Sequence, residues 1–168
     1  MCHVAGFRWD WLMSTMVETG DAPAYAGRVA EMLGVARRFR RGMGSAVAVH
    51  EVLHAGLPRR ALLKAMQSGG ISATELLPVF GISARTYMRL KTEPDKLLDA
   101  EQSGRVWQFA ELLAKAEDVF GSSERAVDWM LRPAMALENR RPIELLTTPV
   151  GAHLVDDVVE RMRYGVYQ

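Results

Sequence analysis

The sequence predicts an all-α fold, and two observations lead to that prediction. Long alternations of valine, isoleucine and threonine are absent from it, and so are the Asn-Gly and Asp-Gly pairs that form tight hairpins. Apolar residues instead recur every three or four positions, a spacing that places them on one buried face of a helix. The clearest series consists of Val106, Phe109, Leu113, Ala116 and Phe120.

The composition is typical of a globular protein and gives no overall attraction to a charged partner. Hydrophobic residues make up 49% of the 168 residues and charged residues 24%, which argues against wholesale disorder. The net charge is +1, so any binding to nucleic acid must come from a local patch. Cys2 is the single cysteine, and no apolar run approaches the ~20 residues of a membrane helix. We therefore expect a cytoplasmic protein that neither forms disulfides nor binds a membrane.

Three helices are expected before residue 68. The first spans about 22–41 and ends in the basic run 37–41, whose cations suit the negative end of a helix. The second spans about 45–55, where a glycine and a proline follow. The third spans about 58–67, with Pro58 suited to the first helical position.

A short helix, a glycine turn and a basic helix follow, which is the outline of a helix-turn-helix. Ser72 and Glu75 have the S-x-x-E spacing of a capping box, in which the serine accepts from a backbone amide and the glutamate reaches back to the cap. Gly81 interrupts this helix, and Ser83 can cap a second one that runs through residues 85–91.

The remainder of the chain is expected to hold a long amphipathic helix, a helix over about 124–131 that Ser122 or Ser123 caps, two short helices and a last helix. Gly121 ends the long helix, and Pro133 and Pro142 each suit the start of a short one. Thr148 can cap the last helix, and Gly165 can end it in the left-handed conformation. The apolar face of this last helix consists of Val155, Val158, Val159 and Met162.

The most specific motifs of the chain follow one another in its C-terminal part. They are VFG at 119–121, WMLRP at 129–133, AL at 136–137, PIELLTT at 142–148, then Gly151, Val155 and RMRYGVY at 161–167. In this order and spacing the chain, from about residue 60 onward, resembles the Xre/MbcA/ParS antitoxins, whose partners are RES-domain toxins.

The resemblance implies that the protein is an antitoxin and not an enzyme, with no cofactor, no metal and no catalytic residues. RES toxins resemble ADP-ribosyltransferases and consume NAD or transfer ADP-ribose from it. The antitoxin would bind the toxin directly and cover its active site with the C-terminal tail, as a homodimer that forms a hetero-oligomer with the toxin. Exposed tyrosines offer a large contact area at low entropy cost. The residues expected to contact the toxin are Arg161, Arg163, Tyr164, Gly165, Val166, Tyr167 and Gln168.

The basic helix that begins near Arg85 resembles the recognition helix of the same family, through which the antitoxin would bind its own promoter DNA. Residues near the start of such a helix face base edges in the major groove, whereas later basic residues more often meet phosphate. The expected base contacts are Ser83, Arg85 and Thr86, the expected phosphate contacts are Arg89 and Lys91, and Tyr87 completes the set.

Pro78 departs from this pattern because it falls inside the helix that precedes the recognition helix. A proline there removes a backbone hydrogen bond, so that helix is expected to be short or kinked. The alternative is that these helices form a scaffold whose charges are merely solvated, which the small net charge does not argue against.

A motif that precedes the predicted helix-turn-helix in the chain indicates a different function. The segment His50-Glu51-Val52-Leu53-His54 fits H-E-x-x-H, in which two histidines on one helix face bind Zn²⁺ and the glutamate activates water. The extended form of the motif fails because Gly56 arrives one residue early, and no further histidine follows at the required place. Glu75 is the only nearby third ligand, and it already has an expected capping role.

We therefore interpret the chain as three parts: an N-terminal helical extension over 1–57, a helix-turn-helix module over 58–98, and a small helical toxin-binding domain over 99–168. The leading hypothesis is an antitoxin of a type II toxin–antitoxin system that also regulates its own operon. The first alternative is a helix-turn-helix transcriptional regulator without a toxin partner. The second alternative is a zinc metallopeptidase that uses His50, Glu51 and His54.

Overall fold

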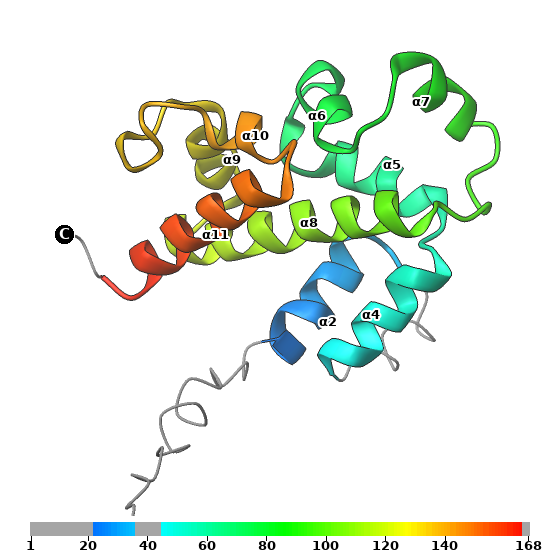
Figure 1. The fold of residues 1–168 in the computed structure, drawn as a ribbon, viewed down its shortest axis with the longest axis horizontal. Helices are drawn as coiled ribbons and strands as arrows, with labels where there is room; N and C mark the ends of the chain where they lie inside the picture. Colours follow the sequence, from blue (N-terminus) through cyan, green and yellow to red (C-terminus); the bar gives the residue numbers. More distant parts are fainter. Residues whose placement is uncertain (1–21, 36–44, 166–168) are drawn as a thin grey trace, which may run out of the picture.

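A computed structural model describes residues 22–35 and 45–165 (Figure 1). Within these ranges the chain is helical and contains no strand, only two isolated backbone bridges. The all-α prediction is confirmed. The basic run 37–41, Cys2 and residues 166–168 lie outside the described ranges. Among the described helices, none is both long and apolar enough to cross a membrane.

The long helix α8, Ala100–Phe120, is the axis of the molecule, and most other helices pack against it (Figure 1). Asp99 caps its start by accepting a hydrogen bond from the Gln102 amide at 2.7 Å. Gly121 ends it in the left-handed conformation, with φ of 79°, as the sequence predicts. Four of the five residues in the predicted apolar stripe are buried, and Phe120 is partly buried. The predicted core face is therefore the observed one.

Helices α2, Ala22–Met32, and α4, Ala46–Ala55, pack on one side of α8. The expectation of one helix over 22–41 is wrong, because α2 ends at Met32. Gly34 adopts a positive φ of 60°, and the amide of Val35 donates to the carbonyl of Ala30 at 2.9 Å, which closes the helix end. Helix α4 begins after Ser45, whose side chain accepts from the Ala48 amide as expected of a cap.

Helices α5, Arg59–Gln67, α6, Ala73–Val79, and α7, Ala84–Leu90, follow, with a single 3₁₀ turn, η1, at Ser68–Gly70. Pro58 is the cap of α5 and not its first helical residue, which corrects the prediction. Its extended ψ of 145° lets the chain form a backbone bridge to Leu97, which precedes α8.

Helices α9, Ser123–Leu131, α10, Pro142–Leu145, and α11, Pro149–Arg163, complete the fold. Pro142 begins α10, and Thr148 caps α11, as predicted. Pro133 does not begin a helix. The 3₁₀ turn η2 starts only at Met135, because the Ala134 amide pairs with the Arg140 carbonyl at 3.0 Å and holds the chain extended there.

Aromatic contacts join the parts of the core. Phe80, after α6, meets Phe109 of α8 edge to face with ring centroids 5.5 Å apart, which ties the helix-turn-helix to the axis. Trp107 is buried on α8, and Trp129 stacks on Phe120 at 5.3 Å. The sequence did not decide between a core and an interface position for these two tryptophans, and both now have core partners.

Candidate functional site

Helices α6 and α7 form the helix-turn-helix, and local caps define it. The Ser72 hydroxyl accepts from the Glu75 amide at 3.4 Å, and the Ser83 hydroxyl accepts from the Thr86 amide at 3.1 Å. Gly81 makes the turn between the two helices, with φ of 64°. Pro78 lies in the last turn of the short helix α6, so the expectation of a short helix is confirmed.

The outward face of α7 presents two guanidinium groups. Arg85 and Arg89 are exposed and lie four residues apart on this face, while Leu90 is buried on the opposite side. Neither guanidinium group forms a hydrogen bond or ion pair with any residue that the structure describes. Lys91 folds back so that its Nζ lies 4.4 Å from the centroid of the half-buried Tyr87 ring. The structure thus leaves Arg85 and Arg89 available for an anionic partner.

The two arginines of α5, the helix before the helix-turn-helix, are less available to an anionic partner than those of α7. Arg59 donates to Glu93 at 2.7 Å, and Arg60 is paired with Asp95. Both acidic residues belong to the connector that leads from α7 to α8. The positive charge of the helix-turn-helix is therefore concentrated on α7.

The C-terminal end of α11 presents the second predicted surface. Arg161 is exposed, and Tyr164 is 67% exposed just after the helix. Gly165 has a φ of 66°, which confirms the predicted left-handed helix stop. The guanidinium carbon of Arg163 lies 5.6 Å from the centroid of the Tyr164 ring and 5.6 Å from that of the Tyr25 ring on α2. The predicted contacts Val166, Tyr167 and Gln168 lie outside the described residues.

The sequence analysis missed two exposed apolar residues on the outward face of α11. Val150 is 73% exposed and Leu154 is 48% exposed. Together with Arg161 and Tyr164 they follow helical spacing on one face, opposite the buried residues. That spacing is visible in the sequence and could have identified the stripe.

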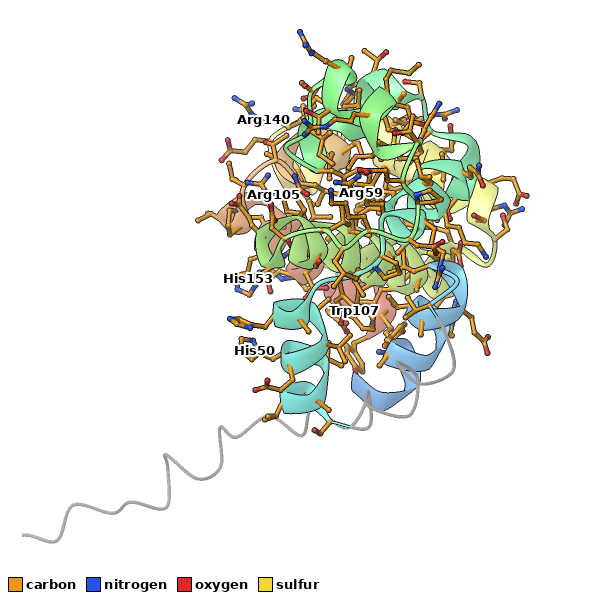
Figure 2. All side chains as sticks on the ribbon, turned by 90° about the vertical axis from the view of Figure 1, so that its right-hand side faces the viewer. His50, Arg59, Arg105, Trp107, Arg140 and His153 are labelled. Atoms are coloured by element: carbon orange, nitrogen blue, oxygen red, sulfur yellow. The ribbon has the colours of Figure 1, made fainter. Side chains whose placement is uncertain are left out.

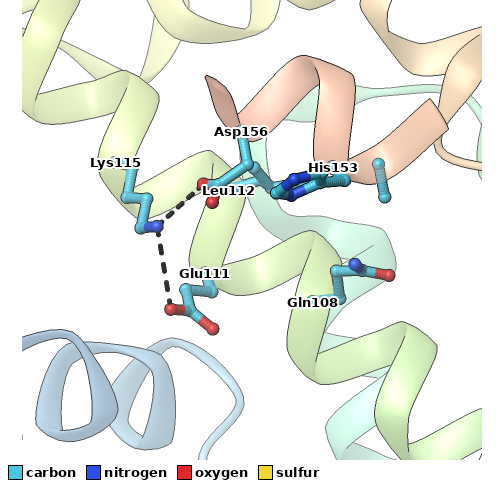
Figure 3. Close-up of a pocket in the computed structure, with 7 residues that line it drawn as sticks. Gln108, Glu111, Leu112, Lys115, His153 and Asp156 are labelled. Atoms are coloured by element: carbon cyan, nitrogen blue, oxygen red, sulfur yellow. Dashed lines mark hydrogen bonds and ion pairs between the residues drawn. The ribbon is translucent and has the colours of Figure 1, made fainter. Parts of the chain in front are cut away.

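Ion pairs hold α11 against α8. Lys115 donates to Asp156 of α11 at 2.7 Å (Figure 3). It also lies 3.1 Å from Glu160 of α11. Burial alone would lower the pKa of Lys115, but the hydrogen bond to Asp156 and the surrounding carboxylates raise it overall. Burial raises the pKa of Glu111 in the same shallow pocket, where Lys115 lies 4.0 Å away. These ion pairs fix the position of α11 against α8.

A second connection, also missed, joins the helix-turn-helix to the C-terminal helices. Arg141, which precedes α10, donates two hydrogen bonds to the Glu75 carboxylate, at 3.0 and 3.2 Å. The expected capping box is therefore only half formed, because Arg141 takes the carboxylate that was expected to reach back to Ser72. No local signal indicates a pair that lies 66 positions apart.

His50 and His54 both lie on the exposed side of α4, with ring centroids 6.1 Å apart. Figure 2 labels His50 on this helix. Glu75 is engaged by Arg141, so it is not placed as a third ligand. Across the described part of the chain, no group of three histidine, cysteine or acidic residues is placed to hold a metal ion. The structure gives the peptidase alternative no support.

Two family models match the chain. Residues 48–111 match the antitoxin Xre-like helix-turn-helix domain, and residues 115–165 match the antitoxin Xre/MbcA/ParS C-terminal toxin-binding domain. The two matches meet within α8, and α2 lies outside both. The predicted division at residues 57 and 98 stays a prediction.

Three characterised relatives carry the same name. The chain is 35% identical over 98 residues to "Antitoxin Xre" of Yersinia enterocolitica, which covers 58% of this chain and 66% of that protein. It is 29% identical over 119 residues to "Antitoxin Xre" of Photorhabdus laumondii, covering 70% and 80% of the two chains. It is 26% identical over 117 residues to "Antitoxin Xre" of Pseudomonas putida, covering 70% and 72%. The chain therefore spans slightly less than two thirds of the first relative and more of the other two.

Proposed function

We propose that this chain, which belongs to the Xre/MbcA/ParS family of antitoxins, binds a RES-domain toxin through its C-terminal domain and blocks the toxin's NAD-consuming or ADP-ribosylating site. The proposal is supported above all by the exposed end of α11, which is the last helix of the region similar to toxin-binding domains. The proposed role is stoichiometric and not catalytic, and the encounter takes place in the cytoplasm.

The proposed mechanism is steric, with α11 as the docking element. Val150 and Leu154 give its outward face apolar area, and Arg161 adds a cation near the end. Tyr164 contributes a large ring whose immobilisation costs little entropy. The segment that starts at Arg163 would continue from this docked helix into the active site of the toxin.

A truncation tests the proposal. Deletion of Tyr164–Gln168 begins after the last residue of α11, at a side chain that is 67% exposed, so the protein should keep its thermal unfolding temperature. The variant should no longer silence the NAD turnover of the toxin. Inhibition by the truncated chain that equals inhibition by the full chain would refute the occlusion mechanism.

Binding to promoter DNA is a second proposed activity, favoured by two arginines on α7 whose guanidinium groups have no partner among the described residues. Helix-turn-helix dimers read half-sites about one helical turn of DNA apart, so this activity fits the proposed homodimer. A transcriptional regulator without a toxin partner is the remaining alternative. Failure to bind a RES toxin, with DNA binding retained, would favour that alternative.

A further inference from the structure

Helix α2 contacts the C-terminal part of the chain, although it lies outside both regions matched by the family models. Figure 1 shows it below α8, on the side where α11 ends. Tyr25 on α2 is 5% exposed, and its hydroxyl donates to Asp118 of α8 at 2.7 Å. The far end of the chain is therefore linked to this N-terminal helix through a buried aromatic side chain.

Three cations surround the Tyr25 ring. The guanidinium carbon of Arg163 is 5.6 Å from the ring centroid, that of Arg28 is 5.8 Å away, and the Lys115 Nζ is 6.0 Å away. Each lies within the range in which a ring attracts a cation. Burial, followed by the hydrogen bond to Asp118, raises the pKa of Tyr25 to about 12, so the ring stays neutral at physiological pH.

Arg163 connects the residues around the Tyr25 ring to Tyr164, the first residue of the C-terminal tail. It is the last residue of α11, and it also lies 5.6 Å from the Tyr164 ring and 3.8 Å from Glu160. Its guanidinium is thus held between a ring on α2 and the ring that begins the tail. Arg163 is therefore in contact range of both the buried ring of α2 and the exposed ring that follows α11.

We propose that Tyr25 is a positioning residue for toxin neutralisation: it holds Arg163, and with it the last turn of α11, so that Tyr164 projects toward the toxin before the two proteins meet. This inference rests on the proposed function, because it concerns the same tail. A segment ordered in its bound direction loses less conformational entropy on binding, which strengthens the complex. The N-terminal helix thereby acquires a part in toxin binding without contacting the toxin.

Two substitutions at Tyr25 separate the ring from the hydroxyl. Tyr25→Phe keeps the ring face and loses the hydrogen bond to Asp118, so it should leave toxin affinity close to that of the parent. Tyr25→Leu keeps an apolar side chain and loses the ring, so it should weaken affinity about three- to thirtyfold, the range of a cation–π contact. Arg163→Gln should weaken toxin affinity to the same degree. This variant tests the same contact if Tyr25→Leu fails to fold.

A merely structural role for Tyr25 is tested by repeating the Tyr25→Leu substitution in the chain that lacks Tyr164–Gln168. The affinity of each purified chain for the toxin is measured by calorimetry, with DNA binding as a check on the fold. The inference predicts that Tyr25→Leu has no further effect once the tail is gone, because the two changes act through one element. An equal loss in both backgrounds would overturn it.

The outcomes distinguish this inference from the function on which it rests. If the truncation alone leaves toxin affinity and inhibition unchanged, the tail mechanism fails and this inference fails with it. If the truncation weakens binding while both Tyr25→Leu and Arg163→Gln bind like the parent, only the positioning role of Tyr25 is overturned.

Discussion

Arg85 and Arg89 should make different contributions to DNA binding, although both are exposed cations on one face of α7. Arg85 lies in the first turn, which approaches base edges when a recognition helix enters the major groove. Arg89 lies one turn later, where phosphate contact is expected. Arg85→Ala should therefore reduce discrimination between sequences, and Arg89→Ala should weaken binding to all sequences.

The size of each effect can be worked out because neither guanidinium group is engaged by another described residue. Because neither has to leave a partner among the described residues, the loss of one should cost its whole contact with DNA. Arg85→Ala should cost about 1–3 kcal/mol on the promoter site and little on unrelated DNA. Arg89→Ala should make the slope of log K against log salt shallower by about 0.9 for each protomer bound.

The measurement is a titration of promoter and unrelated duplexes at several salt concentrations. Arg125→Ala on α9 is the matched control, because it removes the same charge from the end of the molecule away from α7 (Figure 1). It should leave both the affinity and the salt slope unchanged. Equal DNA binding by parent, Arg85→Ala and Arg89→Ala would refute the interface and favour a helix-turn-helix that serves only as a scaffold.

Two further predictions concern stability. Gly151→Ala should destabilise the fold by about 1–3 kcal/mol in a thermal unfolding assay, because the added Cβ would lie 2.1 Å from the Leu145 carbonyl oxygen. The control is Gly104→Ala, whose added Cβ meets no atom within 4 Å. This variant should be neutral or stabilising in the same assay. Equal unfolding temperatures would contradict this account of the junction between α10 and α11. The raised pKa of Tyr25 means that the folded state keeps a proton which the unfolded chain loses near pH 10, so the free energy of unfolding should fall as the pH rises from 10 to about 12. Tyr25→Phe should remove about 2–3 kcal/mol of that fall in denaturant titrations, and an identical fall in the variant would show that Tyr25 does not cause it.

Local chemistry made the helix starts predictable. Ser72, Ser83 and Thr148 all cap helices as the sequence indicates, because a cap depends only on a side chain and an amide three residues later. Helix ends and proline positions were less predictable. Pro133 suits a helix start by propensity, but a backbone bridge between Ala134 and Arg140 keeps the chain extended there.

Contacts between distant residues could not be predicted from one sequence. The Glu75 carboxylate had a plausible local role in a capping box, yet it binds the Arg141 guanidinium through two charge-assisted hydrogen bonds, which are stronger than a bond to a neutral amide. The approach of Arg163 to Tyr25 likewise depends on how α2 and α11 pack around α8. Most of the predicted DNA and toxin contacts that the structure describes are exposed, whereas Thr86 and Tyr87 are partly buried, and the roles of all of them stay predictions.

The central claim is that this chain binds and silences a toxin, and one measurement tests it most directly. The chain is co-expressed with a RES-domain toxin, the two are co-purified, and the NAD consumption of the toxin is followed with and without the chain. The account predicts a tight complex in which NAD consumption stops at a fixed stoichiometry. A partner that does not co-purify, or that consumes NAD at an unchanged rate in the presence of excess chain, would contradict it.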